Sequence, residues 1–219
     1  MNITQLQLLT DDIPATTAFY RDVLGLVLQR SEASSVTFSA GATELVFRRS
    51  YQVQPVYHIA FTIPSDKLEE AIAYIQARTG LIDIPGGGVV ADFSNWHAES
   101  FYFYDNNGSV LEYIARHDLD NKTDLPFVAT DICCISEIGL VTDDVPALAA
   151  QLSTAYAIPY FSKQSPQDHF TVMGDDEGLF IIVVKDRHWY PTGIPAGIFP
   201  TVIRFTDGRG KEQEWRSGF

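Results

Sequence analysis

The feature of this sequence that most constrains its fold is an internal repeat. The segment LTDDIPA at residues 9–15 recurs as VTDDVPA at residues 141–147. In both copies a short apolar run leads into Thr-Asp-Asp, which is typical of a helix N-cap, and a proline two residues later suits the first helical turn. A repeat of this kind indicates one supersecondary unit that is used more than once. Each copy therefore predicts a strand, a cap and a helix, in that order.

A third, more divergent copy begins at YHIAFTIP, where Ser65 and Asp66 would supply the cap and KLEEAIAYIQARTGL is typical of an amphipathic helix ending at Gly80. Alternating, β-rich runs follow each of the three helices. The sequence thus predicts an α+β fold of repeated βαβββ modules, paired to form a curved mixed sheet around a cleft. The three units are expected at about residues 2–50, 55–117 and 132–186, and PTVIRF at 200–205 would start an incomplete fourth unit or form a closing edge strand.

The polar stretch at 118–131 contains one proline and no sustained period, which favours a linker. We therefore predict three parts: paired units one and two at 1–117, the linker, and the third unit with the C-terminal edge strand at 132–219. The first two units are expected to form one continuous sheet with the cleft between them. The third unit would serve in a homodimer or as a cover for that cleft.

Charge and hydropathy exclude several classes of partner. The net charge of −13 would repel a phosphate backbone, so nucleic acid is not expected as a partner. No apolar run approaches the roughly 18 residues of a membrane helix, and the N-terminal segment lacks a secretory pattern. The adjacent Cys133 and Cys134 would point to opposite faces of a strand and could not bridge easily. We expect a cytoplasmic protein that binds a small molecule.

Strand alternation places possible ligands on one face. In YHIAFTI the apolar alternate residues should pack on the helix, which turns His58 to the opposite face. The same reasoning in SVLEYIAR turns Glu112 to the face of His58. Alignment of the first unit on its Thr-Asp-Asp cap puts Gln5 in the register of His58, and alignment of ATELVFRR on GSVLEYIAR puts Glu44 in the register of Glu112.

The predicted metal site is therefore the quartet of Gln5, Glu44, His58 and Glu112. One nitrogen and three oxygen donors suit Zn²⁺, Ni²⁺, Co²⁺, Mn²⁺ or Fe²⁺, and the sequence does not choose among these divalent ions. Taken singly, a strand histidine or an edge-strand glutamate is more often structural than a ligand. In the third unit Glu137 takes the register of His58, but Ile182 stands at the position that we match to Glu112. That unit is expected to hold no metal site of its own.

Further residues could form a substrate pocket. In SFYFY, Tyr102 and Tyr104 share one face of the strand and could line a cavity. Trp96 and His97 precede this strand, where they would lie at the rim for a planar or apolar substrate, although a tryptophan at such a place is more often a loop anchor. These four residues are the predicted substrate pocket.

The paired βαβββ units, together with AFYRDVLGL at 18–26 and FYFYDNNGSVLEYIAR at 101–116, resemble the vicinal oxygen chelate superfamily. The resemblance covers most of residues 2–186 and specifies the superfamily better than the activity. A Gln/Glu/His/Glu set is similar to the ligands of glyoxalase I, in which a metal stabilises an enediolate-like oxyanion and a glutamate moves the proton. The resemblance implies that Glu44 or Glu112 is the catalytic base.

Two other functions remain open within the same resemblance. Extradiol dioxygenases use two histidines and one carboxylate on Fe(II), and Gln5 removes the second imidazole unless His97 reaches the site. Bleomycin-resistance-like members bind small molecules without a metal. The sequence therefore favours a metal-dependent glyoxalase-like enzyme, with a metal-free binding protein and a ring-cleaving dioxygenase as the alternatives.

Overall fold

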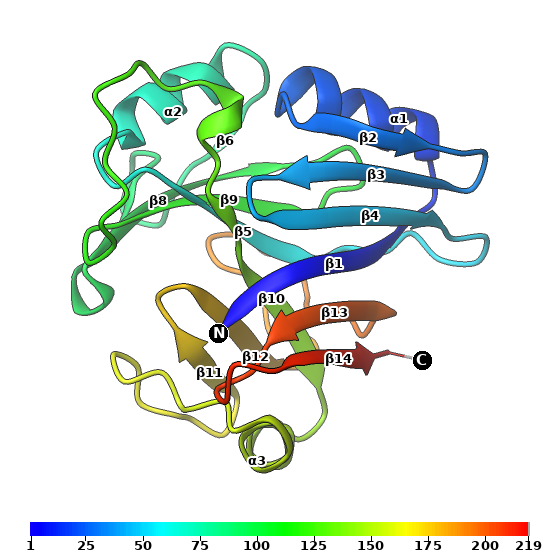
Figure 1. Cartoon of the computed structure of the whole chain (residues 1–219), viewed down its shortest axis with the longest axis vertical. Helices are drawn as coiled ribbons and strands as arrows, with labels where there is room; N and C mark the ends of the chain where they lie inside the picture. The colour runs from blue at the N-terminus through cyan, green and yellow to red at the C-terminus, as the bar shows by residue number, and fades with distance from the viewer. Residues whose placement is uncertain (219) are drawn as a thin grey trace.

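A computed structural model describes residues 1–218 of the chain, and its strands form two mixed sheets (Figure 1). The first sheet has the order β14 (Glu212–Ser217), β13 (Thr201–Thr206), β1 (Asn2–Thr10), β4 (Thr43–Arg49), β3 (Ser35–Ala40), β2 (Val27–Ser31). The second has the order β11 (Phe170–Asp175), β12 (Gly178–Val184), β10 (Cys134–Thr142), β5 (His58–Ile63), β9 (Val110–Arg116), β8 (Ala98–Tyr104), β6 (Leu81–Ile82), and β7 (Ala91–Phe93) pairs with β8.

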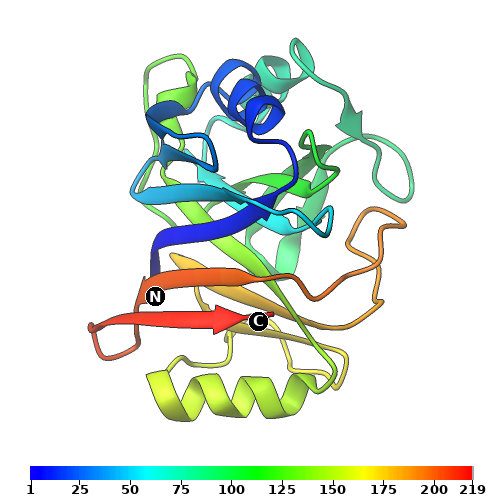
Figure 2. The ribbon, with the colours of Figure 1, turned by 90° about the vertical axis from the view of Figure 1, so that its right-hand side faces the viewer.

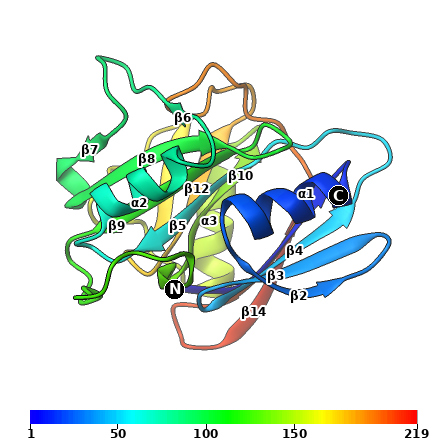
Figure 3. The same ribbon diagram turned by 90° about the horizontal axis from the view of Figure 1, so that it is seen from above.

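Each of the three predicted units begins with a strand (β1, β5 or β10), and an α-helix follows it. The three helices are α1 (Ile13–Ala18), which continues as a short π-helix at Phe19–Val23, α2 (Leu68–Gln76) and α3 (Val145–Tyr156). In the two copies of the Thr-Asp-Asp motif the second aspartate caps the helix: Asp12 accepts a hydrogen bond from the Ala15 backbone N–H and Asp144 from that of Ala147, each at 2.9 Å. The predicted α+β fold of repeated βαβββ modules is confirmed. Figure 1 shows α1 and α2 at the same end of the molecule, and Figure 3 looks down on that end.

The pairing of the units differs from the prediction. β5 of the second unit pairs antiparallel with β10 of the third, so these two units share the second sheet. β1 of the first unit pairs with β13, and β14 extends this sheet as its edge strand (Figure 2). The prediction that units one and two form one continuous sheet is therefore wrong. The C-terminal strands instead supply the incomplete fourth unit, and β14 was not foreseen from the sequence.

The sheets differ from the prediction because the first strands of the units, β1 and β5, each have a free edge that a later strand can pair with. The polar segment 118–131 is long enough to bring the chain from the end of β9 to the far side of β5, where β10 completes the sheet. β1 then needs another neighbour, and β13 provides it. Each sheet thus contains segments from both sides of 118–131, while the division into domains at that segment stays a prediction.

One continuous apolar core joins both sheets to the three helices. It contains the residues that alternation assigned to the helix side of the second unit: Ile59, Phe61, Ile63, Leu111, Tyr113 and Ala115. Phe180 of the second sheet packs against Phe205 of the first with ring centroids 5.3 Å apart. A second cluster covers the opposite face of the second sheet, and this face carries the candidate site. Within the described residues no helix combines the length and the apolar character that crossing a membrane requires.

Candidate metal centre

Three titratable side chains converge on the open face of the second sheet. His58, Glu112 and Glu137 each offer a ligand atom, and these atoms all lie within 4.8 Å of one another. The His58 Nε2 atom is 3.5 Å from a Glu112 carboxylate oxygen. All three side chains are buried, with residue exposures of 7% for His58 and 3% for each glutamate. One imidazole nitrogen and two carboxylates form a donor set that suits a divalent transition metal.

The strand register creates this convergence. On β5, Ala60 pairs with Glu112 of β9 on one side and with Glu137 of β10 on the other. Because alanine is small, the two carboxylates flank an open space instead of a side chain. A register shift between Ile135 and Glu137 is a β-bulge, a device that re-aims side chains next to functional sites.

Backbone contacts orient the imidazole of His58. Its Nδ1 atom lies 3.2 Å from the Val110 carbonyl oxygen, which can only accept a hydrogen bond. The proton therefore sits on Nδ1, and Nε2 presents its lone pair to the two carboxylates. Burial lowers the pKa of His58, which also favours the neutral, ligating form. A metal ligand held by a carbonyl on its other nitrogen is a common arrangement in protein metal sites.

A buried arginine lies beneath the carboxylates. Arg116 is fully buried, and its Nη2 atom donates to a carboxylate oxygen of Glu137. Its Nη1 atom is 3.6 Å from the Asp176 carboxylate, an ion-pair contact, and that carboxylate accepts a hydrogen bond from Lys163 at 2.7 Å. Arg116 thus balances only part of the negative charge of the pair formed by Glu112 and Glu137. The remaining charge favours a bound cation or a shared proton.

The pKa values of the two glutamates report this imbalance. Burial, followed by the nearby Glu112 carboxylate, raises the pKa of Glu137 to about 7, while Arg116 and His58 act in the opposite direction. Burial also raises the pKa of Glu112, against the lowering effects of Ser100, Tyr102 and Arg116. Without a metal, the folded protein therefore holds a proton at this site under conditions in which the unfolded chain has released it.

A pH dependence of stability follows. Between the ordinary glutamate pKa of 4.5 and a folded value of about 7, the metal-free native state binds more protons at Glu137 than the unfolded state does. Stability from this group is therefore present at low pH and lost as the pH rises through 7. We expect the free energy of unfolding of the metal-free protein, relative to Glu137→Gln, to fall by up to about 3 kcal/mol over this window.

The measurement is urea unfolding of both proteins in chelator at several pH values. The free energy of unfolding of the variant is subtracted from that of the wild type at each pH. This subtraction removes most of the contributions of His58 and Glu112, which are present in both proteins. The lowered pKa of His58 would otherwise add a rise in stability with pH below pH 6.5. A difference between the two proteins that stays constant from pH 4.5 to 8 would contradict a proton held at Glu137.

A cavity of about 240 Å³ lies over the three side chains. Its volume is at the small end for ligand pockets, so it suits a small molecule. Aromatic side chains make most of its wall: Phe93, Trp96, Tyr102, Phe170, Trp189 and Tyr190. The Trp189 indole lies over His58, with ring centroids 5.2 Å apart. The cavity thus places flat apolar surfaces around a polar floor.

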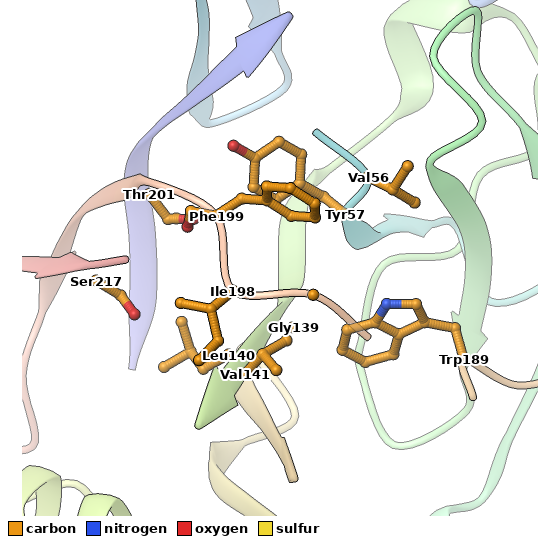
Figure 4. A pocket seen from close by; sticks show the side chains of 11 residues that line it. Val56, Tyr57, Gly139, Leu140, Val141, Trp189, Ile198, Phe199, Thr201 and Ser217 are labelled. Carbon is orange, nitrogen blue, oxygen red and sulfur yellow. The ribbon is translucent and has the colours of Figure 1, made fainter. Parts of the chain in front are cut away.

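The connection between β12 and β13 covers this cavity and also encloses a small void on its other side. Backbone hydrogen bonds from Ala196 N–H to the Arg187 carbonyl (2.8 Å) and from Trp189 N–H to the Ile194 carbonyl (2.9 Å) fold residues 187–196 back on themselves. The void beneath, between Tyr57, Ile198 and Phe199, measures only about 10 Å³, roughly the space of one water (Figure 4). It is too small to be a ligand site.

Gly139 fixes the position of the Trp189 indole. A Cβ atom at Gly139 would lie 2.4 Å from the nearest indole carbon, and the two residues are neighbours in Figure 4. Trp189 is 3% exposed and has little room to retreat. We expect Gly139→Ala to cost about 1–3 kcal/mol of stability, the usual range for overpacking, and to shift the tryptophan fluorescence.

Thermal and urea unfolding check this expectation, with Gly193→Ala as the matched control. Gly193 lies in the same covering segment, and an added Cβ there would meet nothing within 4 Å. Equal stability of the two variants would show that the indole is not held by contact with Gly139.

The structure does not bring the predicted quartet together. Gln5 and Glu44 are paired with each other on the first sheet, where Gln5 Nε2 donates to the Glu44 carboxylate. The strand pairing explains why the alignment failed. Glu44 pairs with Gln5, and in the second unit the residue that pairs with His58 is Val110. Glu112 lies two residues further along its strand than Val110. Val46, not Glu44, therefore occupies the register of Glu112. Glu137 joins His58 and Glu112 in place of these two residues.

The register of the third unit needs a correction of one residue. Leu179 pairs with Glu137 as Val110 pairs with His58, so the counterpart of Glu112 is Ile181 and not Ile182. Ile181 lines the cavity, whereas Ile182 lies in the main core. The third unit does lack a second carboxylate at this register. It nevertheless supplies Glu137 to the cluster that it forms with His58 and Glu112 of the second unit.

The predicted pocket residues separate into two pairs. Trp96 and Tyr102 line the cavity. His97 and Tyr104 do not: His97 is exposed and its Nδ1 atom lies 2.7 Å from Asp118, and Tyr104, at the end of β8, is 39% exposed. His97 therefore does not bring a second imidazole to the site.

Sequence reasoning missed two arginines of this site, Arg116 and Arg187. Arg116 ends the apolar strand run SVLEYIAR, and a charge that closes an otherwise buried strand is the signal that could have pointed to it. Arg187 lies in the connection after β12 and lines the cavity. No periodicity marks such a position.

Comparison with known proteins agrees with the fold. Residues 2–113 match the family described as Glyoxalase/Bleomycin resistance protein/Dioxygenase superfamily. Because the match covers half of the sequence, the chain belongs to this superfamily. A comparison with curated protein sequences found no match.

Solved structures show the same architecture. A proposed dioxygenase from Bacillus subtilis superposes with a TM-score of 0.63 and 13% identity, over 100% of this chain and 85% of that one. A variant of glyoxalase I from Zea mays gives a TM-score of 0.55 and 13% identity, over 99% and 92% of the two chains. At such identities the likeness establishes the fold and not the activity.

Proposed function

We propose that this protein is a metal-dependent, glyoxalase-like enzyme that acts on a small substrate with neighbouring oxygen atoms. The observation that carries the proposal is the convergence of His58, Glu112 and Glu137 on the floor of a cavity. Two buried carboxylates beside a neutral imidazole, with one arginine to balance them, form a site whose charge a divalent cation would complete. A small-molecule substrate and a cytoplasmic location belong to the same proposal.

The three side chains would hold Zn²⁺, Ni²⁺, Co²⁺, Mn²⁺ or Fe²⁺, and such an ion would supply Lewis acidity toward the substrate oxygens. Residues of the chain would position the ligands, accept a proton and exclude water. Arg116 keeps Glu137 in place through its buried ion pair. Glu112 is the group suited to accept a proton from a carbon beside those oxygens, because burial raises its pKa toward the working range of a general base. Trp189 covers the site and limits the entry of water.

Ring cleavage is less well supported. An extradiol site uses two histidines and one carboxylate, whereas the described part of the chain brings one histidine and two carboxylates together. His97, which could have filled the gap, is exposed, and its Nδ1 atom lies 2.7 Å from the Asp118 carboxylate instead.

A metal-free binding protein is the second candidate, and one observation favours it. Arg116 already pairs with Glu137, and the fourth equivalent position holds the apolar Ile181. With one shared proton the floor of the cavity would be neutral, and its aromatic walls could bind a ligand alone.

Metal analysis followed by a proton-exchange assay separates the two. The purified protein is stripped with chelator, reloaded anaerobically with each of the five ions, and incubated with small α-hydroxyketones in D₂O. We expect stoichiometric loading and exchange of the carbon-bound proton with at least one ion. An absence of metal binding at micromolar concentrations, with ligand binding unaffected by chelator, would establish the binding protein instead.

A further inference from the structure

Arg187 is a cation in the cavity without a carboxylate partner. Among residues 1–218 no acidic group lies within salt-bridge distance of it, and its Nη1 atom donates only to the His188 carbonyl, at 3.3 Å. Its guanidinium lies over the Phe170 ring, 4.8 Å from the centroid. Arg116, by contrast, is paired with Glu137. A half-buried guanidinium keeps its charge, so Arg187 presents several unused donors to the cavity.

Arg187 lies at the start of residues 187–196, the part of the β12–β13 connection that covers the cavity, and backbone contacts fix its position. Asp186 adopts a left-handed backbone conformation with a φ of 66°, which turns the chain sharply after β12. The hydrogen bonds on either side, from Asp186 N–H to the Ala196 carbonyl and from Ala196 N–H to the Arg187 carbonyl, hold this turn. Arg187 lines the same cavity as His58, and its charge acts on that imidazole. A donor fork on such a fixed backbone is suited to a planar anion.

The charges of the cavity indicate the charge of its ligand. Arg116 is paired with Glu137, whereas Arg187 lies beyond salt-bridge distance of both glutamates and does not take the place of a cation beside them, so the cavity as a whole counts two carboxylates and two guanidiniums. Asp176, beneath Arg116, is paired with Lys163. A divalent cation would leave the cavity with two positive charges. A substrate with one ionised oxygen at the metal and one separate anionic group would neutralise them.

We propose that Arg187 forms an anion-binding subsite, and that the substrate is a small planar acid with metal-chelating oxygens at one end and a carboxylate at the other. The aromatic walls, including Trp96 and Trp189, fit a flat ring or a conjugated chain between the two ends. The whole protein carries a net charge of −13 and repels anions at long range, so a local cation is needed to admit one. The chelating part of this proposal rests on the proposed metal-dependent function; the anion subsite does not.

Two ligand pairs test the parts separately. The first pair, 4-hydroxybenzoate and 4-hydroxybenzamide, has no neighbouring oxygens to chelate and is titrated into metal-free protein, with tryptophan fluorescence as the readout. The second pair, 3,4-dihydroxybenzoate and 3,4-dihydroxybenzamide, is titrated anaerobically into Zn²⁺-loaded protein. Within each pair we expect the wild type to bind the carboxylate about 10- to 100-fold more tightly than the amide, as a charge-assisted hydrogen bond implies.

Arg187→Met should remove this preference in both pairs by weakening the carboxylate and leaving the amide unchanged. Lys185→Met is the matched control, because Lys185 is an exposed cation two residues away that does not line the cavity. It should retain the preference. Arg187→Lys, which keeps the charge but not the fork, should retain part of it.

The outcomes are distinguishable. Equal binding of acid and amide by the wild type, or an equal loss of preference in Arg187→Met and Lys185→Met, overturns the subsite. The first pair can behave as expected while Zn²⁺ gives the dihydroxy ligands no additional affinity. The anion subsite then stands, but the proposal that the substrate chelates a metal is overturned, together with the metal-dependent function. Failure of all four ligands to bind the wild type overturns the proposed class of planar acids.

Discussion

Replacement of His58 by alanine is expected to lower the affinity for a divalent metal by at least about a hundredfold. His58 supplies the only nitrogen donor of the three converging side chains, and its Nε2 atom is oriented by the Val110 carbonyl on the other side of the ring. Changes that only disturb the groups around a ligand already cost 10- to 100-fold, so loss of the ligand itself should cost more. The measurement is competition with a chromophoric chelator, which does not depend on catalysis.

Two controls sharpen this experiment. Gln5→Ala and Glu44→Gln alter the members of the predicted quartet that lie on the first sheet, and both should keep the wild-type metal affinity. Circular dichroism and thermal unfolding would show whether His58→Ala remains folded. Wild-type metal affinity in a folded His58→Ala variant would remove the metal-dependent proposal and favour the binding protein.

The sequence was informative wherever a property is local to one strand or one turn. Alternation along β5 correctly assigned Ile59 and Phe61 to the core and His58 to the opposite face, because the two-residue period of a strand is a local constraint. The repeated aspartates at 12 and 144 correctly marked two helix starts. The third start was displaced: Lys67, and not the Ser65–Asp66 pair, stands at the N-cap of α2, where no side chain provides a capping hydrogen bond.

The pairing of whole units is not a local property, and this is where the sequence was insufficient. Units one and two are adjacent in the chain, which favoured their pairing, yet the free edge of β5 is equally able to accept β10. Glu137 was already placed in the register of His58, and only the assumed pairing excluded it from the site. Errors in register also misplaced two residues. An error of one residue selected Ile182, whose side chain lies on the opposite face of the sheet from that of Ile181, and an error of two residues along the strand selected Glu44 instead of Val46.

Replacement of the buried Arg116 is expected to have the largest effect on stability. In metal-free protein, Arg116→Met would leave Glu137 and Asp176 without this positive partner, and breaking a buried pair from one side costs about 3–5 kcal/mol. Methionine fills much of the same volume, so the loss would report charge more than packing. Urea unfolding in the presence of chelator is the measurement.

The double variant Arg116→Met/Glu137→Gln separates the buried pair from a general packing role. Removing both charges should recover a large part of the stability, because the penalty comes from the unpaired carboxylate and not from the absence of the ion pair. Saturating metal should likewise recover stability in the single variant, since a cation at His58, Glu112 and Glu137 would replace the lost positive charge. Strictly additive losses in the double variant, with no additional stabilisation by metal, would mean that Arg116 acts through packing alone. The charge argument for a cation at this site would then lose its basis.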